Sequence, residues 1–263
     1  MRTYLAALLL LCAGLGIAQV PSGGETMTGL AYPEPEANAA WRALASGYVR
    51  KALRDQKLDK DPVLNARVDA AMAAVGAAVA VIDQRFAGSG WRAILIEGFG
   101  RGAAAFPGGT ILVDASFVRN LSLSDDELAL ILSHEAAHVL AGHASAKLSF
   151  MAETLGKEKV PTARTALVEF LAKDSYAAEF MPRARLQERE ADTLGAAIFV
   201  ATGYDPRRAL KLFDKLAEHE ARGHSRAGHE VDSHDAARVR KQAVARVIAE
   251  LRNIAPRVTT AAP

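Results

Sequence analysis

The sequence has almost no cysteine, few aromatic residues and little excess charge. Its single cysteine, Cys12, lies in an apolar N-terminal run, which excludes a disulfide framework as the basis of the fold. The formal net charge is +2 over 263 residues without a clustered basic face, so we expect no nucleic-acid partner. After the N-terminal run, no stretch reaches about 18 uninterrupted apolar residues, the length of a membrane span. Half of the residues are hydrophobic, which is enough for one well-packed domain.

The N-terminus carries a targeting signal. Arg2 is followed by the apolar run Leu5–Ile17, and small residues occupy the two positions that a signal peptidase reads. We therefore predict a signal peptide over 1–18, cleaved after Ala18, and an exported protein of the periplasm or cell envelope. The alternative is an uncleaved membrane anchor formed by residues 5–20.

The remaining chain is predicted to form one domain. Residues 19–37 are rich in proline and glycine and poor in large apolar side chains, so they are assigned to a linker. The folded domain is expected over 38–255, followed by a flexible tail over 256–263.

Hydrophobic patterns within this domain predict a mostly helical α+β fold with a small antiparallel sheet of about three strands. Strands are expected at 91–96 and 110–113, with a tight Phe-Pro-Gly-Gly turn at 106–109 before the latter. Helices are expected at 38–57, 62–86, from Ser124 onward with a capping box, 182–202, 205–221 and 234–253. Residues 146–182 show no pattern from which a role can be predicted.

The pentapeptide at 134–138 has the HExxH pattern and falls on the helix that begins near Ser124, whose apolar residues predict burial. Residues four apart lie about 40° from one another around a helix, so His134 and His138 can bind one zinc ion from successive turns. Glu135 lies about 100° round the helix, where it suits a general base that takes a proton from metal-bound water.

A third ligand is still required. His143 follows His134 by nine residues, about 180° round a continuous helix, so it is expected to point away and to have a structural or supporting role. Glu188 and Asp192 share one face of a separate predicted helix. Such a pair suits one ligand carboxylate and one carboxylate that accepts the N–H of a metal-bound histidine. Glu190 lies about 200° from Glu188 and should face elsewhere.

With these motifs the chain resembles the HtpX and CAAX-prenyl-protease type of zinc endopeptidase, in its soluble, envelope-resident branch. The resemblance runs from about Asp61 to Lys241, and three stretches carry it, namely 106–113, 126–139 and 188–192. It implies a zincin-like gluzincin domain that holds one zinc ion per chain. It further implies His134, His138 and Glu188 as metal ligands, Glu135 as the catalytic base, Asp192 behind His134, and a strand near 110–114 that borders the cleft and pairs with extended substrate.

Two departures from the family pattern affect the substrate side of the site. Relatives often carry Asn-Ala-(Phe or Tyr)-Ala before the Pro-Gly-Gly turn, whereas residues 102–105 read Gly-Ala-Ala-Ala. Relatives often carry Thr-His-Pro with an arginine six residues after the histidine; here His234 and Arg240 keep that spacing, but Asp235 replaces the proline. The resemblance makes His234 a candidate zinc cap and Arg240 a candidate oxyanion stabiliser. The alternative for Arg240 is a solvated helix charge.

Histidines also recur every five residues from His219 to His234, and His224 and His229 fall in a predicted loop at 222–232. This spacing puts no two of them on one helical face, so they are interpreted as part of a solvated loop, or alternatively of a flap over the site.

The predicted function is a zinc metalloendopeptidase that hydrolyses internal bonds of protein or peptide substrates in envelope quality control, with peripheral membrane association as a further possibility. The rival hypothesis is a zinc-containing chaperone or assembly factor whose peptidase activity is latent or regulated.

Overall fold

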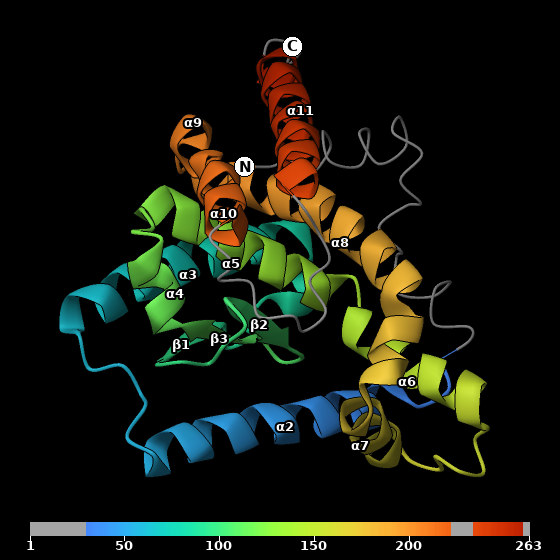
Figure 1. Cartoon of the computed structure of the whole chain (residues 1–263). Coiled ribbons are helices and arrows are strands. Elements are labelled where there is room, and N and C mark those ends of the chain that lie inside the picture. Colours follow the sequence, from blue (N-terminus) through green and yellow to red (C-terminus); the bar gives the residue numbers. More distant parts are fainter. Residues whose placement is uncertain (1–29, 222–233, 260–263) are drawn as a thin grey trace.

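The fold is described from a computed structural model, in which residues 30–221 and 234–259 are placed, and side chains over 30–221 and 237–253. These residues form ten helices and three strands (Figure 1). The helices are α2 Glu34–Arg54, α3 Pro62–Ile82, α4 Ala115–Asn120, α5 Asp125–Leu140, α6 His143–Leu155, α7 Ala163–Ala172, α8 Asp174–Thr202, α9 Pro206–Ala209, α10 Lys211–Ala221 and α11 His234–Thr259. The strands are β1 Arg92–Ile96, β2 Ala103–Phe106 and β3 Thr110–Asp114, and a 3-10 turn spans Gln84–Phe86. The predicted mostly helical α+β class is confirmed.

The sheet has the order β1-β3-β2 and is mixed rather than antiparallel, which corrects the prediction. The Pro-Gly-Gly turn joins β2 and β3 as an antiparallel hairpin, as expected, but β1 pairs with β3 in parallel. The connection from β1 passes beyond β3 to the far edge of the sheet before the hairpin returns to the middle. A local turn signal fixes the hairpin, whereas the strand that lies beside β1 depends on this longer connection.

Because β3 is central, its backbone is paired on both sides and cannot add a further strand. All five of its residues are buried. The expectation that the strand near 110–114 pairs with substrate is therefore wrong. The outer edge of β1 is covered by a bridge from Leu58 to Ile96, whereas β2 lies at the other edge, against α5. The edge strand beside the HExxH helix is β2.

Helix α5 runs through the centre of the molecule, between the sheet and α8 (Figure 1). Its predicted capping box is present, because Ser124 accepts from the Glu127 N–H while the Glu127 carboxylate accepts from the Ser124 N–H. Leu128 and Leu132 are almost fully buried in the core that α5 shares with α3 and α8. The cap and this apolar surface together explain where the helix begins and why it is buried.

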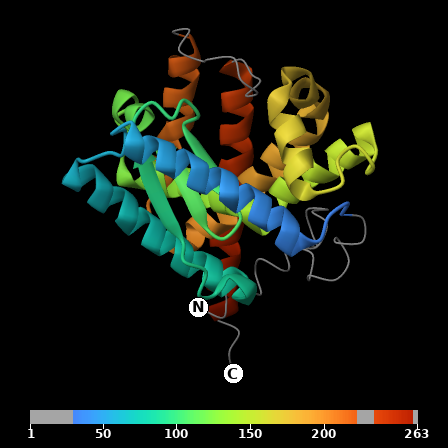
Figure 2. The ribbon, with the colours of Figure 1, turned by 90° about the horizontal axis from the view of Figure 1, so that it is seen from below.

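A second core lies on the other face of the sheet, where α2 crosses it and continues over α6 and α7 (Figures 1 and 2). The Trp41 indole packs 6.4 Å from the Phe106 ring of β2 and donates to the Ala144 carbonyl of α6 at 2.9 Å. Residues 146–182, which had no predicted role, form most of α6, all of α7 and the first part of α8, and they pack here.

Several predicted boundaries are corrected. Helix α2 begins at Glu34, inside the predicted linker 19–37, and Tyr32 just before it is 2% exposed. Helix α8 begins at Asp174, so Pro182 lies inside it instead of opening it. Burial of Tyr176 and Phe180 against α6 and α7 favours helix in that first part despite the proline.

Near the C-terminus, the predicted helix over 205–221 is divided into α9 and α10 at Leu210. Helix α11 continues to Thr259, beyond 253 and into the predicted tail 256–263. The predicted signal peptide 1–18 and the loop 222–232 lie outside the described residues.

Within the described part of the chain, one helix, α3, is long and apolar enough to cross a membrane. Core helices of soluble proteins pass the same test, and Val68, Val75 and Val79 of α3 are buried in the core.

Candidate metal centre

Three side chains from two helices converge where α5 crosses α8. His134 and His138 lie on successive turns of α5, and their Nε2 atoms are 3.0 Å apart. The two carboxylate oxygens of Glu188 in α8 face one nitrogen each: Oε2 lies 3.3 Å from His134 Nε2, and Oε1 lies 3.3 Å from His138 Nε2. Two imidazoles and a carboxylate are a donor set that zinc accepts, and three protein ligands leave a further position for water or substrate.

The two helices approach closely because α8 has a glycine at the crossing. A Cβ atom added to Gly195 would lie 2.8 Å from the His134 Cα and 3.1 Å from its backbone nitrogen. Ala191 and Ala136 are both fully buried. Small residues thus let α8 bring Glu188 within reach of the α5 histidines.

The outer nitrogen of His134 faces a carboxylate. Its Nδ1 lies 3.1 Å from Asp192 Oδ1, the place that the family resemblance implied for Asp192. Burial by itself lowers the pKa of His134, but the contacts with Asp192 and Glu188 outweigh it and raise this pKa to about 10. The same contacts hold the pKa values of Glu188 and Asp192 below their usual range, although burial opposes this.

Arg240 reaches the same carboxylates from α11. Its Nε and Nη2 donate to the two oxygens of Asp192 at 2.8 and 2.9 Å, and Nη2 lies 3.6 Å from Glu188 Oε2. The two-point contact fixes the orientation of the Asp192 carboxylate. His234 begins α11, and its side chain lies outside the described part of the structure.

The outer nitrogen of His138 faces His143, which corrects the expectation that His143 points away. The two Nδ1 atoms are 2.8 Å apart, and His143 Nε2 lies 3.2 Å from Glu190 Oε2. Helix α5 ends at Leu140, and Gly142 adopts a left-handed conformation with φ of 68°, so the rotation expected for one continuous helix does not apply. Glu190, expected to face elsewhere, reaches this histidine. Burial dominates at His138 and lowers its pKa to about 4.

Glu135 faces the edge of the sheet. Burial raises the pKa of Glu135 above its ordinary value, although the nearby Ala105 N–H of β2 favours the charged carboxylate and opposes the rise. The Asp114 N–H donates to the Gly102 carbonyl at 2.7 Å, which sets the pairing of the hairpin. By the alternation of antiparallel pairing, Ala103 and Ala105 direct their N–H and C=O groups away from β3, toward the free edge.

A lysine that the sequence analysis missed lies near the site. Lys147 of α6 interacts electrostatically with Glu135 and Glu188, and burial lowers its pKa. Its ammonium lies 5.8 Å from the centre of the Trp41 ring. Residue 147 falls in the stretch without a recognisable pattern, and no local signal could have found it.

Among the described histidine side chains, His219 is the one that lies apart from the candidate metal ligands and from His143. His219 of α10 stacks edge-on against Phe117, with ring centres 6.4 Å apart. His224 and His229 lie outside the described residues.

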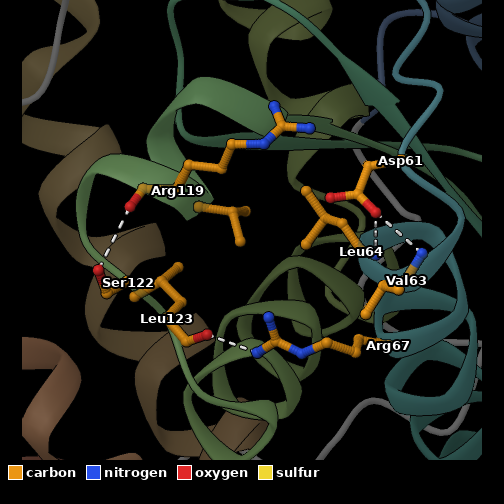
Figure 3. Close-up of a pocket in the computed structure, with 8 residues that line it drawn as sticks. Asp61, Val63, Leu64, Arg67, Arg119, Ser122 and Leu123 are labelled. Atoms are coloured by element: carbon orange, nitrogen blue, oxygen red, sulfur yellow. Dashed lines mark hydrogen bonds between the residues drawn. The ribbon is translucent and has the colours of Figure 1, made fainter.

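A pocket whose lining includes none of these ligands lies between the start of α3 and the end of α4 (Figure 3). Its two arginines already have partners. Arg67 donates to Asp125 Oδ1 and to the Leu123 carbonyl, and Arg119 pairs with Asp59 and Glu97. These ion pairs satisfy the charges of the pocket within the chain.

Comparison with known proteins agrees with this geometry. A family model described as Peptidase family M48 matches residues 65–247. The protein named mitochondrial metalloendopeptidase OMA1 of Saccharomyces cerevisiae is 28% identical over 120 residues, which are 45% of this chain and 34% of that protein. The protein of the same name from Arabidopsis thaliana is 28% identical over 137 residues, 50% of this chain and 27% of that protein. The match thus spans about a third or less of each relative's length.

Proposed function

Because the chain belongs to peptidase family M48, we propose that it is a zinc-dependent endopeptidase that hydrolyses internal peptide bonds of proteins. The observation that carries the proposal is the convergence of His134, His138 and Glu188 beside Glu135, at the free edge of β2. This convergence supports a site in which a metal ion, a base and a strand edge would act together.

Zinc held by these three residues would polarise the scissile carbonyl and lower the pKa of the attacking water. Glu135 would hold the proton lost by the attacking water and give it to the leaving amine. Its raised pKa suits this double role, because a base poised nearer neutral pH can both take and return a proton.

Substrate binding is proposed at the edge of β2. The outward N–H and C=O groups of Ala103 and Ala105 would pair with an extended peptide, as in strand addition. The Ala105 N–H also favours the charged form of Glu135, so a substrate carbonyl that takes this N–H would make the Glu135 carboxylate a stronger base. Alanine side chains along β2 leave room beside the bound peptide.

Two further residues are proposed to act in the reaction. Arg240 carries a positive charge 3.6 Å from the ligand Glu188 and orients Asp192, which supports a part for it in stabilising the site or the oxyanion. His234, at the start of the same helix, is proposed as the residue that caps the zinc in a resting state.

The substitution Glu135→Gln tests the proposal. It should abolish cleavage of casein or a model peptide while zinc content stays at one per chain. Glu153→Gln, an exposed glutamate of α6, is the matched control and should leave both unchanged. Wild type that lacks peptidase activity, with folding assistance intact in Glu135→Gln, would support the rival assembly factor instead.

Location and biological role are also proposals. The charged and apolar N-terminus supports export to the periplasm or envelope, where the substrates would be misfolded or unassembled proteins. The relatives' names assign those proteins to mitochondria. N-terminal sequencing of the mature protein decides between cleavage after Ala18 and a retained anchor.

Peripheral membrane association is supported by exposed apolar side chains on α7. Val168 and Leu171 are 57% and 45% exposed. Co-flotation with liposomes that is lost in Val168→Ser/Leu171→Ser would support this contact, and equal flotation of both proteins would contradict it.

A further inference from the structure

The two histidine ligands are supported from behind in different ways. Asp192 stands behind His134, a direct contact between histidine and carboxylate. Behind His138 stands a second histidine, His143, whose side chain is only 6% exposed and whose far nitrogen faces Glu190. The chain of contacts from His138 through His143 to Glu190 has no part in the chemistry described so far.

We propose that His143 and Glu190 are positioning residues for the zinc ligand His138, an inference that rests on the proposed zinc site. Glu190 fixes the tautomer of His143, and His143 in turn fixes the tautomer and the ring orientation of His138.

The proton positions follow from the geometry. A neutral histidine that binds metal through Nε2 carries its proton on Nδ1. The His138 Nδ1 lies 2.8 Å from the His143 Nδ1, which must therefore act as the acceptor. The proton of a neutral His143 is then on Nε2, where it donates to the Glu190 carboxylate at 3.2 Å. With both rings neutral, this is the one arrangement in which both hydrogen bonds form.

The fold builds this chain from a break between helices. Gly142, with φ of 68°, ends the path of α5 and starts α6 at His143, so that the His143 ring turns back onto His138. Helix α8 then supplies three carboxylates with three tasks. Glu188 faces the metal position, Asp192 faces His134, and Glu190 faces His143.

His143 and Glu190 should contribute unequally to zinc affinity. His143 is buried, and an apolar replacement would leave the His138 Nδ1–H without an acceptor. The Glu190 side chain is 51% exposed, so water can replace part of its contribution. Loss of His143 should therefore weaken metal binding more than loss of Glu190.

The test measures zinc affinity by chelator competition, and the visible spectrum of the cobalt-substituted protein, on the full chain. Removing a group that supports a metal ligand typically weakens binding about 10–100-fold, and His143→Leu should fall in this range. His143→Asn keeps an acceptor near the position of Nδ1 and should recover most of the affinity. Glu190→Ala should lose a smaller factor, and Glu179→Ala, exposed on the same helix, should lose none.

Wild-type zinc affinity and an unchanged cobalt spectrum in His143→Leu would overturn the inference. An equal loss of zinc affinity in His143→Leu and His143→Asn would overturn it too. Such a result would mean that His143 only fills space beside His138 and that its acceptor nitrogen is unimportant. If His143→Leu does not fold, Glu190→Ala decides, because its exposed side chain is dispensable for packing. Zinc affinity is measured without any peptide cleavage. A wild-type protein that binds zinc, loses affinity in His143→Leu and cleaves no peptide would therefore contradict the proposed peptidase activity but not the positioning role of His143.

Discussion

Two histidines one helical turn apart have opposite titration behaviour in the metal-free protein. His134 lies between Asp192 and Glu188, and its pKa is raised to about 10. His138 faces the His143 ring on its outer side, and burial lowers the pKa of His138 to about 4. At neutral pH these pKa values make His134 an imidazolium with both ring nitrogens protonated, whereas His138 is a neutral imidazole.

This difference predicts the proton balance of zinc uptake. Zinc requires neutral His134, so binding at pH 8 should release the proton that the raised pKa retains there. Asp192→Asn removes one carboxylate without removing a ligand, and the wild type should release up to about one proton more than this variant. Calorimetry in buffers of different ionisation enthalpy measures the number, and equal release by the two proteins would contradict the assigned contact.

The sequence predicted the relation between two site residues correctly where both lie on the same helix. The spacing of His134 and His138 on α5, and of Glu188 and Asp192 on α8, predicted shared faces that the structure also has. The same wheel argument failed for His143 because it assumed a continuous helix. Gly142 was the available signal, since glycine just after an apolar helix is a common stop.

At the scale of the elements, the crossing of α5 and α8 depends on a glycine that carries no chemistry. Gly195→Ala would put a methyl group 2.8 Å from the His134 Cα, so the helices must move apart. We expect a loss of about 1–3 kcal/mol in the free energy of unfolding, together with weaker zinc binding.

Gly47→Ala in α2 is the matched control, because a Cβ there meets no atom within 4 Å. It should raise the free energy of unfolding by about 0.5–1 kcal/mol through helix propensity, with zinc affinity unchanged. Urea unfolding and chelator competition on both variants provide the comparison. A Gly195→Ala protein that behaves like Gly47→Ala would show that the close crossing is unimportant.

The start of α5 is a second test at this scale. Ser124→Ala removes the acceptor for the Glu127 N–H and should cost about 1 kcal/mol of folding stability in urea titrations. Ser175→Ala, exposed on α8, should stay within about 0.5 kcal/mol of wild type. Equal effects of the two substitutions would mean that the cap does not stabilise α5.

Caps explain which boundaries were predictable. Ser124 predicts the start of α5 and Asp61 predicts the start of α3, and each side chain caps its helix in the structure. Pro182 suggested a start for α8 that the structure does not have, because tertiary burial of Phe180 extends the helix upstream of it. The neighbours of β1 were not predictable, since a parallel pair has no turn that marks it.

For the whole molecule, the sheet separates two cores. Along β3, Ile111 and Val113 face the core of α3 and α5, whereas Leu112 faces the core of α2 and α6. The continuous apolar run at 110–113 is typical of a strand buried on both faces. The helices that cover the two faces of the sheet could not be predicted. Helix α2 lies far from β3 in sequence, and its alanine-rich pattern does not indicate which element it packs against.

Trp41 connects this second core to the proposed active site. Its ring backs Phe106 at the end of β2, and its Nε1–H holds the Ala144 carbonyl of α6. Phe106 ends β2 directly after Ala105, whose N–H influences the pKa of Glu135. A loss of support at Trp41 should therefore reach the substrate edge as well as the stability of the fold.

Trp41→Ala should lower the free energy of unfolding by about 3–5 kcal/mol because it leaves a cavity between α2, β2 and α6. Peptide cleavage should fall through a higher KM, since β2 loses its backing while the zinc ligands on α5 and α8 remain in place. Trp41→Phe keeps a ring but loses the hydrogen bond to Ala144, at a cost of about 1–3 kcal/mol. Leu53→Ala, 64% exposed on the same helix, should change neither stability nor KM. A Trp41→Ala protein with wild-type KM and reduced stability would show that α2 stabilises the fold without shaping the substrate edge.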